Sequence, residues 1–414
     1  MKKDILLVSK DALKADYLSC YGGNKWKTPN IDSLAKCGTI FRNYYTASPS
    51  SAMAYTSMFS GLNPYELKRK TYTEVEPFDQ GPTLFDILYS EGYESHVVWD
   101  EAWFRGAYRF SRVYGPNTSF ENLNIQTKVG SHFSRSEKNR SQEKAKPIIK
   151  IIDTVKKISS NRQKPIFLWI HCPHVLAGRT GYGSDMDLFD ELVGKLLDFF
   201  PRDGIYLTAD HGHMDCTKGV PVYGFHLYEP AIKIPLITPD HFGKKEIDDI
   251  ISNIQLKNII LAHKICPQKF IYSDTQYYLQ ENRKLMIRKG DFKYIYNKRD
   301  RSEELYDLKY DPNENVNLLM ENYYDRNRDK NYYLEEIHYY LRWEEAEKAY
   351  NDLKNEKERI WKEETRVKER AIALLYKLYN IKKKGTANFY RYSARKKNTK
   401  GRWNSIVRKV YYEK

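Results

Sequence analysis

The sequence has no long apolar run and no even set of cysteines. No stretch of about 18 apolar residues occurs in its 414 residues, which argues against a membrane-spanning helix. The five cysteines lack the paired spacing of a metal site, so reduced thiols are expected instead of a disulfide framework. The apolar run that follows Met1 is also too short for a secretory signal peptide. Together these absences predict a cytoplasmic protein.

Acidic residues are scarce at the C-terminal end. Residues 381–414 hold twelve Lys or Arg and one acid, so they carry +11 of the total charge of +15. Aromatic residues such as Tyr390 and Trp403 are interleaved with these basic residues. That composition suits an anionic membrane surface, which would make the protein peripheral to a membrane, or an acidic glycan. Nucleic acid is less favoured because no nucleic-acid-binding signature is visible, and a solvated extension is the plain alternative.

The first 240 residues alternate between short apolar runs and helical patterns. Strands are expected at 4–9, 95–99, 165–170 and 204–209, and helices at 28–36, 51–60, 83–90, 147–159 and 188–200. This alternation predicts an α/β fold with a central, mostly parallel sheet covered on both faces. Residues 115–145 have little pattern and are expected to form a surface excursion.

The later part of the chain has a different sequence pattern. Residues 285–296 predict a hairpin that turns at Lys289-Gly290-Asp291, and hence a smaller antiparallel sheet. Residues 332–380 are charged, rich in Tyr and free of Pro and Gly, which indicates long exposed helices. The predicted organisation is a catalytic domain at 1–265, a small-sheet subdomain at 266–320, a charged helical extension at 321–380 and a basic, aromatic tail at 381–414.

Three predicted strands end in residues that bind metals or transfer protons. Asp11 follows the first, His171 and His174 follow another, and Asp210 and His211 follow a third. In open α/β sheets, ligands bind outside the carboxyl ends of the strands. We therefore expect a site where these ends meet.

A helix with clear start and stop signals lies at residues 48–61. A Ser/Pro cluster leads into ten residues without Gly or Pro, and Gly61 and Pro64 follow. Ser50 or Ser51 would stand at the helix N-terminus, where free N–H groups and the helix dipole favour an anion. The plain alternative is that these serines only cap the helix.

Four blocks of sequence resemble the sulfatase branch of the alkaline phosphatase superfamily, in the order of that family. Asp11 and the Thr28-Pro29-Asn30 segment lie in the first, residues 41–64 form the second, and Asp210-His211-Gly212 opens the third. The fourth, near residues 292–318, is similar to the family's C-terminal subdomain. The resemblance implies an alkaline-phosphatase/sulfatase-like sandwich.

The resemblance also implies a cofactor and roles for seven residues. A divalent cation (Ca, Mn or Mg) would be held by Asp11, Asp210 and His211. The family's nucleophile position falls on Ser51, with Ser48 as the competitor. His174 and His226 would contact substrate oxygens or protonate the leaving group, and His213 would be an accessory.

The sequence departs from the family at positions that bear on its chemistry. The family's formylglycine signal reads Ser51-Ala52-Met53-Ala54-Tyr55 here, without its Pro and Arg. Ala12 stands where many members of the family have a second Asp. The acids Asp100 and Glu101 fall in the segment where the family has a sulfate-binding Lys. These losses favour a phosphate ester over a sulfate ester, since an acid at that place repels a dianion.

Three functions follow from these patterns. The first is a metal-dependent hydrolase or phosphotransferase that cleaves a phosphate mono- or diester of a small molecule, a glycan (a polysaccharide included) or a lipid head group, with Ser51 as nucleophile. The second is an atypical sulfatase. The third is a non-catalytic scaffold of the same fold that binds an anionic polymer or membrane through residues 381–414.

Overall fold

We describe the fold from a computed structural model. It describes residues 2–67, 80–99, 117–123, 137–173, 185–220, 223–275, 282–319 and 342–383, except for the side chains of 122, 137–147, 343 and 365–383. Among the helices in these ranges, none is long and apolar enough to cross a membrane. The basic tail beyond residue 383 lies outside the described residues.

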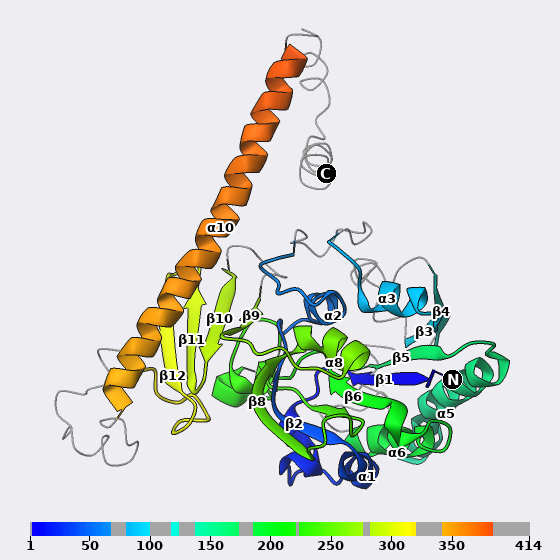
Figure 1. Cartoon of the computed structure of the whole chain (residues 1–414). Helices are drawn as coiled ribbons and strands as arrows, with labels where there is room; N and C mark the ends of the chain where they lie inside the picture. The colour runs from blue at the N-terminus through cyan, green and yellow to red at the C-terminus, as the bar shows by residue number, and fades with distance from the viewer. Residues whose placement is uncertain are drawn as a thin grey trace, which may run out of the picture.

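An eight-stranded sheet forms the centre of the molecule, in the order β4-β3-β5-β1-β6-β7-β2-β8 (Figure 1). In chain order its strands are β1 (Ile5–Lys10), β2 (Thr39–Tyr45), β3 (Glu94–Trp99), β4 (Thr118–Asn122), β5 (Ile166–Cys172), β6 (Ile205–Ala209), β7 (Leu236–Thr238) and β8 (Glu246–Ser252). All neighbours pair in parallel except β7, which runs antiparallel to both β6 and β2. The central strands β1, β5 and β6 are apolar along nearly their whole length because both faces of the sheet are covered.

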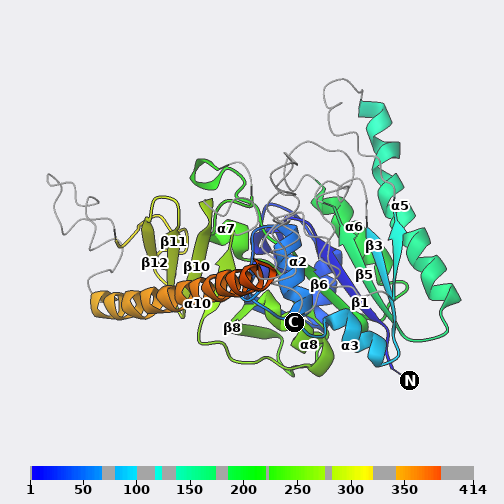
Figure 2. The same cartoon turned by 90° about the horizontal axis from the view of Figure 1, so that it is seen from above.

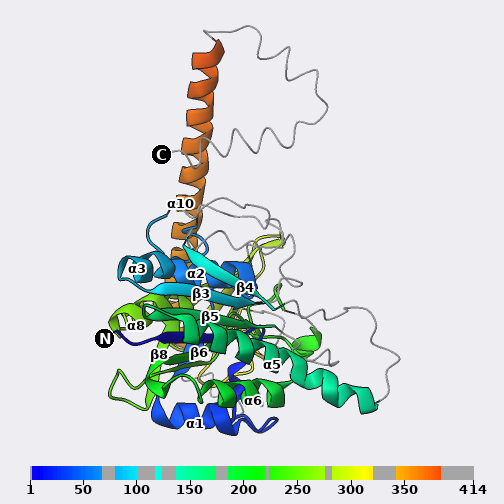
Figure 3. The ribbon, with the colours of Figure 1, turned by 90° about the vertical axis from the view of Figure 1, so that its right-hand side faces the viewer.

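Helices cover both faces of this sheet (Figure 3). One face carries α2 (Ser51–Ser60), α3 (Leu84–Ser90) and α8 (Leu256–Ala262), and the other carries α1 (Pro29–Cys37), α5 (Glu137–Asn161) and α6 (Met186–Leu196). The predicted strands and helices of this part are present, within a few residues except at the start of α5. The surface excursion expected at 115–145 is wrong in part, because β4 extends the sheet there by pairing with β3.

A four-stranded antiparallel sheet lies beside the large one, in the order β12-β11-β10-β9. Its strands are β9 (Ile271–Asp274), β10 (Lys284–Lys289), β11 (Phe292–Asn297) and β12 (Glu303–Asp307). The predicted hairpin is β10–β11, and its turn uses Gly290 at a φ of 57°, which favours glycine. Side chains alternate along β10: Leu285 and Ile287 face one apolar cluster, and Met286 faces another.

The two faces of the small sheet have different partners. The Met286 face packs against the main domain, where α7 (Glu229–Ile232) contributes Ala231 and Ile232. The Leu285 face is covered by α10 (Trp343–Lys383), a helix of 41 residues that runs across the small sheet and on past it (Figure 1, Figure 2). Of the helices expected at 332–380, residues 332–341 lie outside the described residues, and the rest is helical. The first half of α10 is not exposed, because Leu353 and Ile360 are fully buried against the sheet.

Candidate active site

The carboxyl ends of β1 and β6 lie side by side. The two strands are parallel neighbours, and Lys10, the last residue of β1, pairs with Ala209, the last residue of β6. The next residue in each chain segment is an aspartate, so Asp11 and Asp210 leave the sheet at the same edge. The structure thus brings together the strand ends that the sequence singled out.

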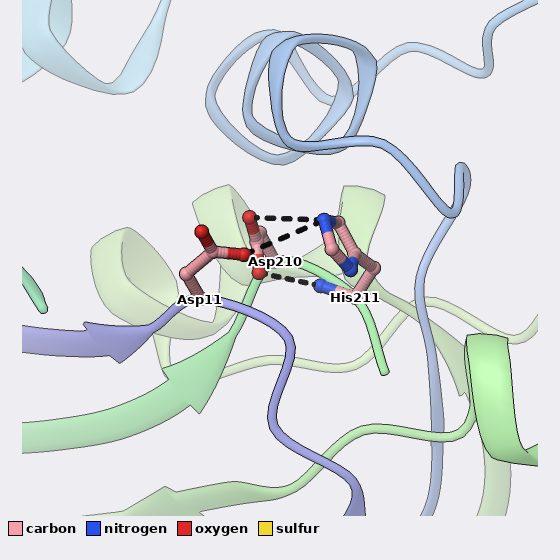
Figure 4. A group of neighbouring side chains, drawn as sticks. All are labelled: Asp11, Asp210 and His211. Atoms are coloured by element: carbon pink, nitrogen blue, oxygen red, sulfur yellow. Dashed lines mark hydrogen bonds and ion pairs between the residues drawn. The ribbon is translucent and has the colours of Figure 1, made fainter. Parts of the chain in front are cut away.

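Asp11, Asp210 and His211 form one compact group (Figure 4). One ligand atom from each residue lies within 4.8 Å of the others, and all three residues are buried. His211 Nε2 is 3.7 Å from Asp11 Oδ1 and 3.5 Å from Asp210 Oδ2. We call these three residues the Asp11 cluster.

The two oxygens of Asp210 have different surroundings. Oδ1 accepts hydrogen bonds from the backbone N–H of Ala12 (3.0 Å) and of His211 (2.8 Å), which fixes the carboxylate. Oδ2 is buried and has no hydrogen-bond donor among the described residues. A buried carboxylate oxygen without a partner is costly unless a cation satisfies it.

The tautomer of His211 is set by its backbone. Its Nδ1 lies 2.8 Å from the carbonyl oxygen of Gly212, and a carbonyl only accepts, so Nδ1 carries the proton. With its proton on Nδ1, the neutral form of the ring offers Nε2 as a ligand atom, as in a metal-binding histidine. Gly212 is required here, because a Cβ would come within 2.1 Å of the carbonyl oxygen of Pro230. Two carboxylates and a neutral imidazole fit a divalent cation.

Ser51 adds a hydroxyl to the Asp11 cluster. Its Oγ is 3.2 Å from His211 Nε2, and since Nε2 accepts, the hydroxyl donates. Ser51 is the first residue of α2, and the cap residue Ser50 makes no side-chain bond to the helix N-terminus. The Ser48 hydroxyl instead donates to the carbonyl oxygen of Asp274 at 2.8 Å. Of the two serines that the sequence left open, only Ser51 contacts the cluster.

Comparisons with known proteins agree with this fold and site. The family model described as Sulfatase matches residues 3–175. An arylsulfatase of Clostridium perfringens is 22% identical over 49% of this chain, and the match spans only 40% of that protein. An uncharacterised sulfatase of Escherichia coli is 22% identical over 77% of this chain and 83% of its own length. Among solved structures, a phosphonate monoester hydrolase of Agrobacterium radiobacter has a TM-score of 0.57 at 16% identity, over 84% of this chain and 95% of its own.

Residues 3–175 thus match the Sulfatase family, and the chain as a whole is similar to sulfatases in sequence and in fold. The predicted fold class is confirmed, down to the large, mostly parallel sheet and the small antiparallel one. The relatives are hydrolases by name, which supports the expectation of an enzyme of the sulfatase family. The match spans less than half of the arylsulfatase, so the substrate and reaction of this chain are matters for proposal.

Tyr55 stands where the resemblance expects an arginine of the formylglycine signal. Its hydroxyl lies 2.8 Å from Ser9 Oγ, and the indole N–H of Trp169 donates to the same oxygen at 2.8 Å. Burial, followed by the charge of Asp210, raises the pKa of Tyr55 well above its usual value, so the residue is neutral. Tyr55 therefore ties α2 to β1 and β5 and brings no positive charge to this sulfatase-like site.

The predicted histidines fall in three different places. His174 lies outside the described residues, as do Asp100 and Glu101. His226 contacts Lys284 and Tyr228 and lines a separate cavity, and among the described residues no hydrogen bond, ion pair or ring contact joins it to the Asp11 cluster. His213 accepts a hydrogen bond from the backbone N–H of Asp215 at 2.9 Å. The catalytic roles of His174 and His226 stay predictions.

Two residues near the site carry roles that the sequence analysis missed. Lys10 is buried and donates to Asp185 Oδ2 and to the carbonyl oxygen of Pro173, each at 3.2 Å, so it ties the end of β5 to the start of α6. The sequence held a signal for this role: a lysine at the end of an apolar strand is expected to be buried, and a buried ammonium needs a carboxylate partner. The ring of Tyr223 lies 4.4 Å from that of His211, and no local pattern indicated that contact.

Proposed function

We propose that the protein is a metal-dependent hydrolase or phosphotransferase that cleaves a phosphate ester with an unmodified Ser51 as nucleophile. The observation that carries this proposal is the contact of the Ser51 hydroxyl with His211, at 3.2 Å within the buried Asp11 cluster. The sequence around Ser51 supports it, because Met53 and Tyr55 replace the residues of the formylglycine signal. A serine that keeps its hydroxyl can attack phosphorus directly.

Asp11 Oδ1, Asp210 Oδ2 and His211 Nε2 would hold a divalent cation: Ca, Mn or Mg. When bound, such a cation neutralises ester oxygens and lowers the pKa of the attacking hydroxyl. The backbone N–H groups of Ala12 and His211 keep the Asp210 carboxylate in place for this task. The Gly212 carbonyl holds His211 in the tautomer that offers Nε2.

The reaction would proceed in two balanced steps. In the first, Ser51 Oγ bonds to phosphorus, the ester P–O bond breaks, and the alcohol leaves with the proton that the serine gave up. In the second, water or an acceptor hydroxyl takes the phosphoryl group and returns a proton to Ser51. The start of α2 supports both steps, because its N-terminal N–H groups and dipole stabilise negative charge next to Ser51.

The test compares two serine variants of the same helix. With an aryl phosphate and Mn²⁺, Ser51→Ala is expected to lower kcat by more than about 10³-fold, as loss of a nucleophile does. Ser57→Ala is the matched control, because Ser57 is buried on α2 and its hydroxyl has no hydrogen-bond partner among the described residues. Equal turnover by the Ser51→Ala variant and the wild type would refute the proposal.

Hydrolysis of a sulfate ester is the second candidate. It is favoured by the curated relatives, since both carry the name sulfatase. That chemistry in this family calls for a formylglycine, so mass spectrometry of the peptide that contains Ser51 distinguishes the two candidates. An aldehyde at Ser51 together with turnover of an aryl sulfate would replace our proposal.

The expected partners form a separate proposal. Residues 384–414 lie outside the described residues, and an anionic membrane or an acidic glycan is supported by their composition alone. Binding to phosphatidylserine vesicles that is lost on truncation after residue 383, without metal binding or ester turnover, would favour a non-catalytic scaffold.

A further inference from the structure

A chain of polar contacts runs from the helix α10 to the segment that precedes Ser51. Its members are Glu364 on α10, Arg283 before β10, Asp274 at the end of β9, and Ser48. These four residues come from segments that lie far apart in the sequence. Arg283, Asp274 and Ser48 are each at most 1% exposed, so the chain of contacts passes through the interior of the protein.

The guanidinium of Arg283 bonds to two acids at once. Nε donates to Asp274 Oδ1 at 3.0 Å and Nη2 donates to Oδ2 at 2.6 Å, which is the two-pronged geometry that suits an arginine and a carboxylate. Nη1 donates to Glu364 Oε2 at 2.8 Å, and the guanidinium carbon lies 4.9 Å from the centre of the Trp361 ring. Glu364 and Trp361 both belong to α10, so Arg283 joins this helix to the end of β9.

The backbone of Asp274 holds the segment that leads into α2. Its N–H donates to the carbonyl oxygen of Ala47 at 2.9 Å, and its carbonyl oxygen accepts from Ser48 Oγ at 2.8 Å. Because the Ser48 proton is used in this way, the Ser50 hydroxyl, 3.2 Å away, donates to Ser48 Oγ. Ser50 is the N-cap residue of α2 and directly precedes Ser51. A shift of Asp274 would therefore be passed to the start of α2.

The main domain holds the same segment through Asn253. Its Oδ1 accepts from the N–H of Ala47 at 3.0 Å, and its Nδ2 donates to Thr46 Oγ1 at 3.3 Å. The segment thus has one anchor in the main domain, at Asn253, and a second one in the small sheet, at Asp274. Only the second anchor is tied to α10 by the contacts described above.

The position of Ser51 has little tolerance for movement. Its hydroxyl must keep the 3.2 Å contact with His211 if it is to react at the Asp11 cluster. A displacement of about 1 Å in an attacking group can lower a rate by about 10²-fold. The charged members of the chain of contacts resist such a displacement, because a buried guanidinium that loses a carboxylate is left with an uncompensated charge.

We propose that Arg283 is a positioning residue for Ser51, through which the docking of α10 controls the proposed active site. The inference rests on the proposed function, because it names what orients the nucleophile of that reaction. With α10 docked, Arg283 holds Asp274, and Asp274 holds the segment before Ser51. Without Glu364, the guanidinium loses its ionic contact with α10, and the start of α2 moves away from its reactive position. The ligands of the Asp11 cluster are not part of this chain of contacts, so metal binding does not depend on it.

Two variants break the contact with α10 and keep the metal site. Glu364→Ala leaves Arg283 paired with Asp274, so this variant is expected to fold. Arg283→Lys keeps a positive charge beside Asp274 but lacks the planar fork that reaches both acids. With an aryl phosphate and Mn²⁺, each variant is expected to lower kcat by about tenfold to 10²-fold, with KM and the affinity for Mn²⁺ unchanged, because only the position of the attacking hydroxyl changes.

Two further variants separate positioning from a general loss of stability. Glu364→Gln keeps an oxygen that accepts from Arg283 Nη1, so it is expected to retain most of the wild-type kcat. Asp352→Ala removes a different acid of α10, which pairs with Lys289 of β10, and it is expected to leave kcat unchanged. A fall in kcat in Asp352→Ala as large as that in Glu364→Ala would overturn the proposal.

Hydrogen–deuterium exchange measures the same coupling without turnover. The informative amides are those of Ala47 and Asp274, whose hydrogen bonds fix the segment before Ser51. In Glu364→Ala they are expected to exchange about tenfold faster than in the wild type, which corresponds to the loss of one hydrogen bond to a charged group. Asp352→Ala should exchange like the wild type. Equal exchange in Glu364→Ala and the wild type would overturn the proposal.

The outcome is separable from that of the proposed function. If Ser51→Ala keeps full phosphoesterase activity and Glu364→Ala exchanges faster, the proposed nucleophile fails, but α10 still controls the segment before Ser51. If Ser51→Ala is inactive and Glu364→Ala keeps the wild-type kcat, only the positioning role of Arg283 fails.

Discussion

The buried carboxylate of Asp210 has one oxygen committed to the fold and one facing Asp11 and His211. Oδ1 accepts two backbone hydrogen bonds, while Oδ2 lies 3.5 Å from His211 Nε2 without a hydrogen-bond donor among the described residues. Two buried carboxylates in one cluster repel each other unless a cation lies between them. The repulsion between the two carboxylates therefore lowers the stability of the metal-free fold, and metal binding would offset that loss.

The Asp210→Asn variant tests whether the charge of Asp210 destabilises the metal-free protein. Asp210→Asn keeps the oxygen that accepts from Ala12 and His211 but removes the charge. We expect the variant to be at least as stable as the wild type in EDTA. The wild type, but not the variant, should gain stability with Mn²⁺, by about 3 kcal/mol at a hundredfold excess of metal over Kd. Thermal unfolding with and without metal measures both, and an equal gain in the two proteins would contradict the account.

His226 gives the protein a dependence of stability on pH. Burial, and then the charge of Lys284, lowers its pKa from 6.5 to about 4 in the folded state. Between these values the unfolded chain binds more protons, so the free energy of unfolding falls as the pH drops from 6.5 to 4. Tyr228, Arg299 and Asp300 are the other titratable or charged groups that face the ring or share its cavity.

The His226→Gln variant should lose part of this dependence. We expect its unfolding free energy to fall less than that of the wild type between pH 6.5 and 4, by up to about 1 kcal/mol, because a half-exposed group contributes less than its full shift in pKa. Urea unfolding at pH 7, 5.5 and 4.5 measures the difference. Identical pH slopes for the two proteins would contradict a neutral, buried His226.

At the residue scale, the members of the Asp11 cluster could be predicted from the sequence, but the contacts of the residues around it could not. Asp11, Asp210 and His211 could be found because polar residues directly follow apolar strands, and parallel strands end at one edge. The stack of Tyr223 on His211 and the bonds of Lys10 to Asp185 and Pro173 join segments far apart in the chain. Such contacts depend on how loops return to the sheet, which no local pattern encodes.

At the element scale, a buried charge cluster joins the small sheet to the main domain. The ammonium of Lys293 on β11 is fully buried, and it lies 3.0 Å from Glu229 on α7 and 2.6 Å from Glu314. Tyr45 of β2 also donates to Glu229, at 2.7 Å. Lys293 lies between the buried Glu314 and the mostly buried Glu229, and Arg288 is a second cation 3.8 Å from Glu229. The docking of the small sheet therefore depends on these paired charges.

Replacing Lys293 should weaken the protein strongly. Lys293→Met leaves two carboxylates buried near each other, and we expect a loss of about 3–5 kcal/mol in unfolding free energy. Adding Glu314→Gln should recover part of that loss, because it removes one of the two charges. Lys348→Met on the exposed side of α10 is the control and should change stability by less than about 0.5 kcal/mol. A loss as small as that of the control would contradict the role of the cluster. Denaturant unfolding measures all of them.

Helices and strands could be predicted where the hydrophobic pattern of the sequence was strong. The predictions were wrong where that pattern was weak. β1, β5 and β6 are apolar runs, and α2 has clear start and stop signals, so their positions follow from the sequence. β4 was missed because Thr118–Asn122 is a short, polar edge strand. The helix α10 was expected to be exposed because charged residues dominate its sequence. Its apolar stripe, which includes Leu353 and Ile360, is narrow and was not recognised.

At the scale of the whole molecule, strands of the large sheet lead into the three residues of the proposed metal site, and α2 begins with the proposed nucleophile Ser51. The small sheet and the loop before α7 both contribute residues to the cavity that His226 lines. The order of the sheet's strands could not be deduced from the sequence, because it depends on the long crossovers between β1, β5 and β6.

The central claim is that an unmodified Ser51 forms a bond to phosphorus. Acid quenching during turnover of an aryl phosphate with Mn²⁺, followed by mass spectrometry of the peptide that contains Ser51, tests it most directly. The account predicts a phosphoryl group on Ser51, which disappears with EDTA and is not transferred to Ser48 in Ser51→Ala. Turnover with phosphate on another residue, or an aldehyde at position 51 with turnover of sulfate esters, would contradict it.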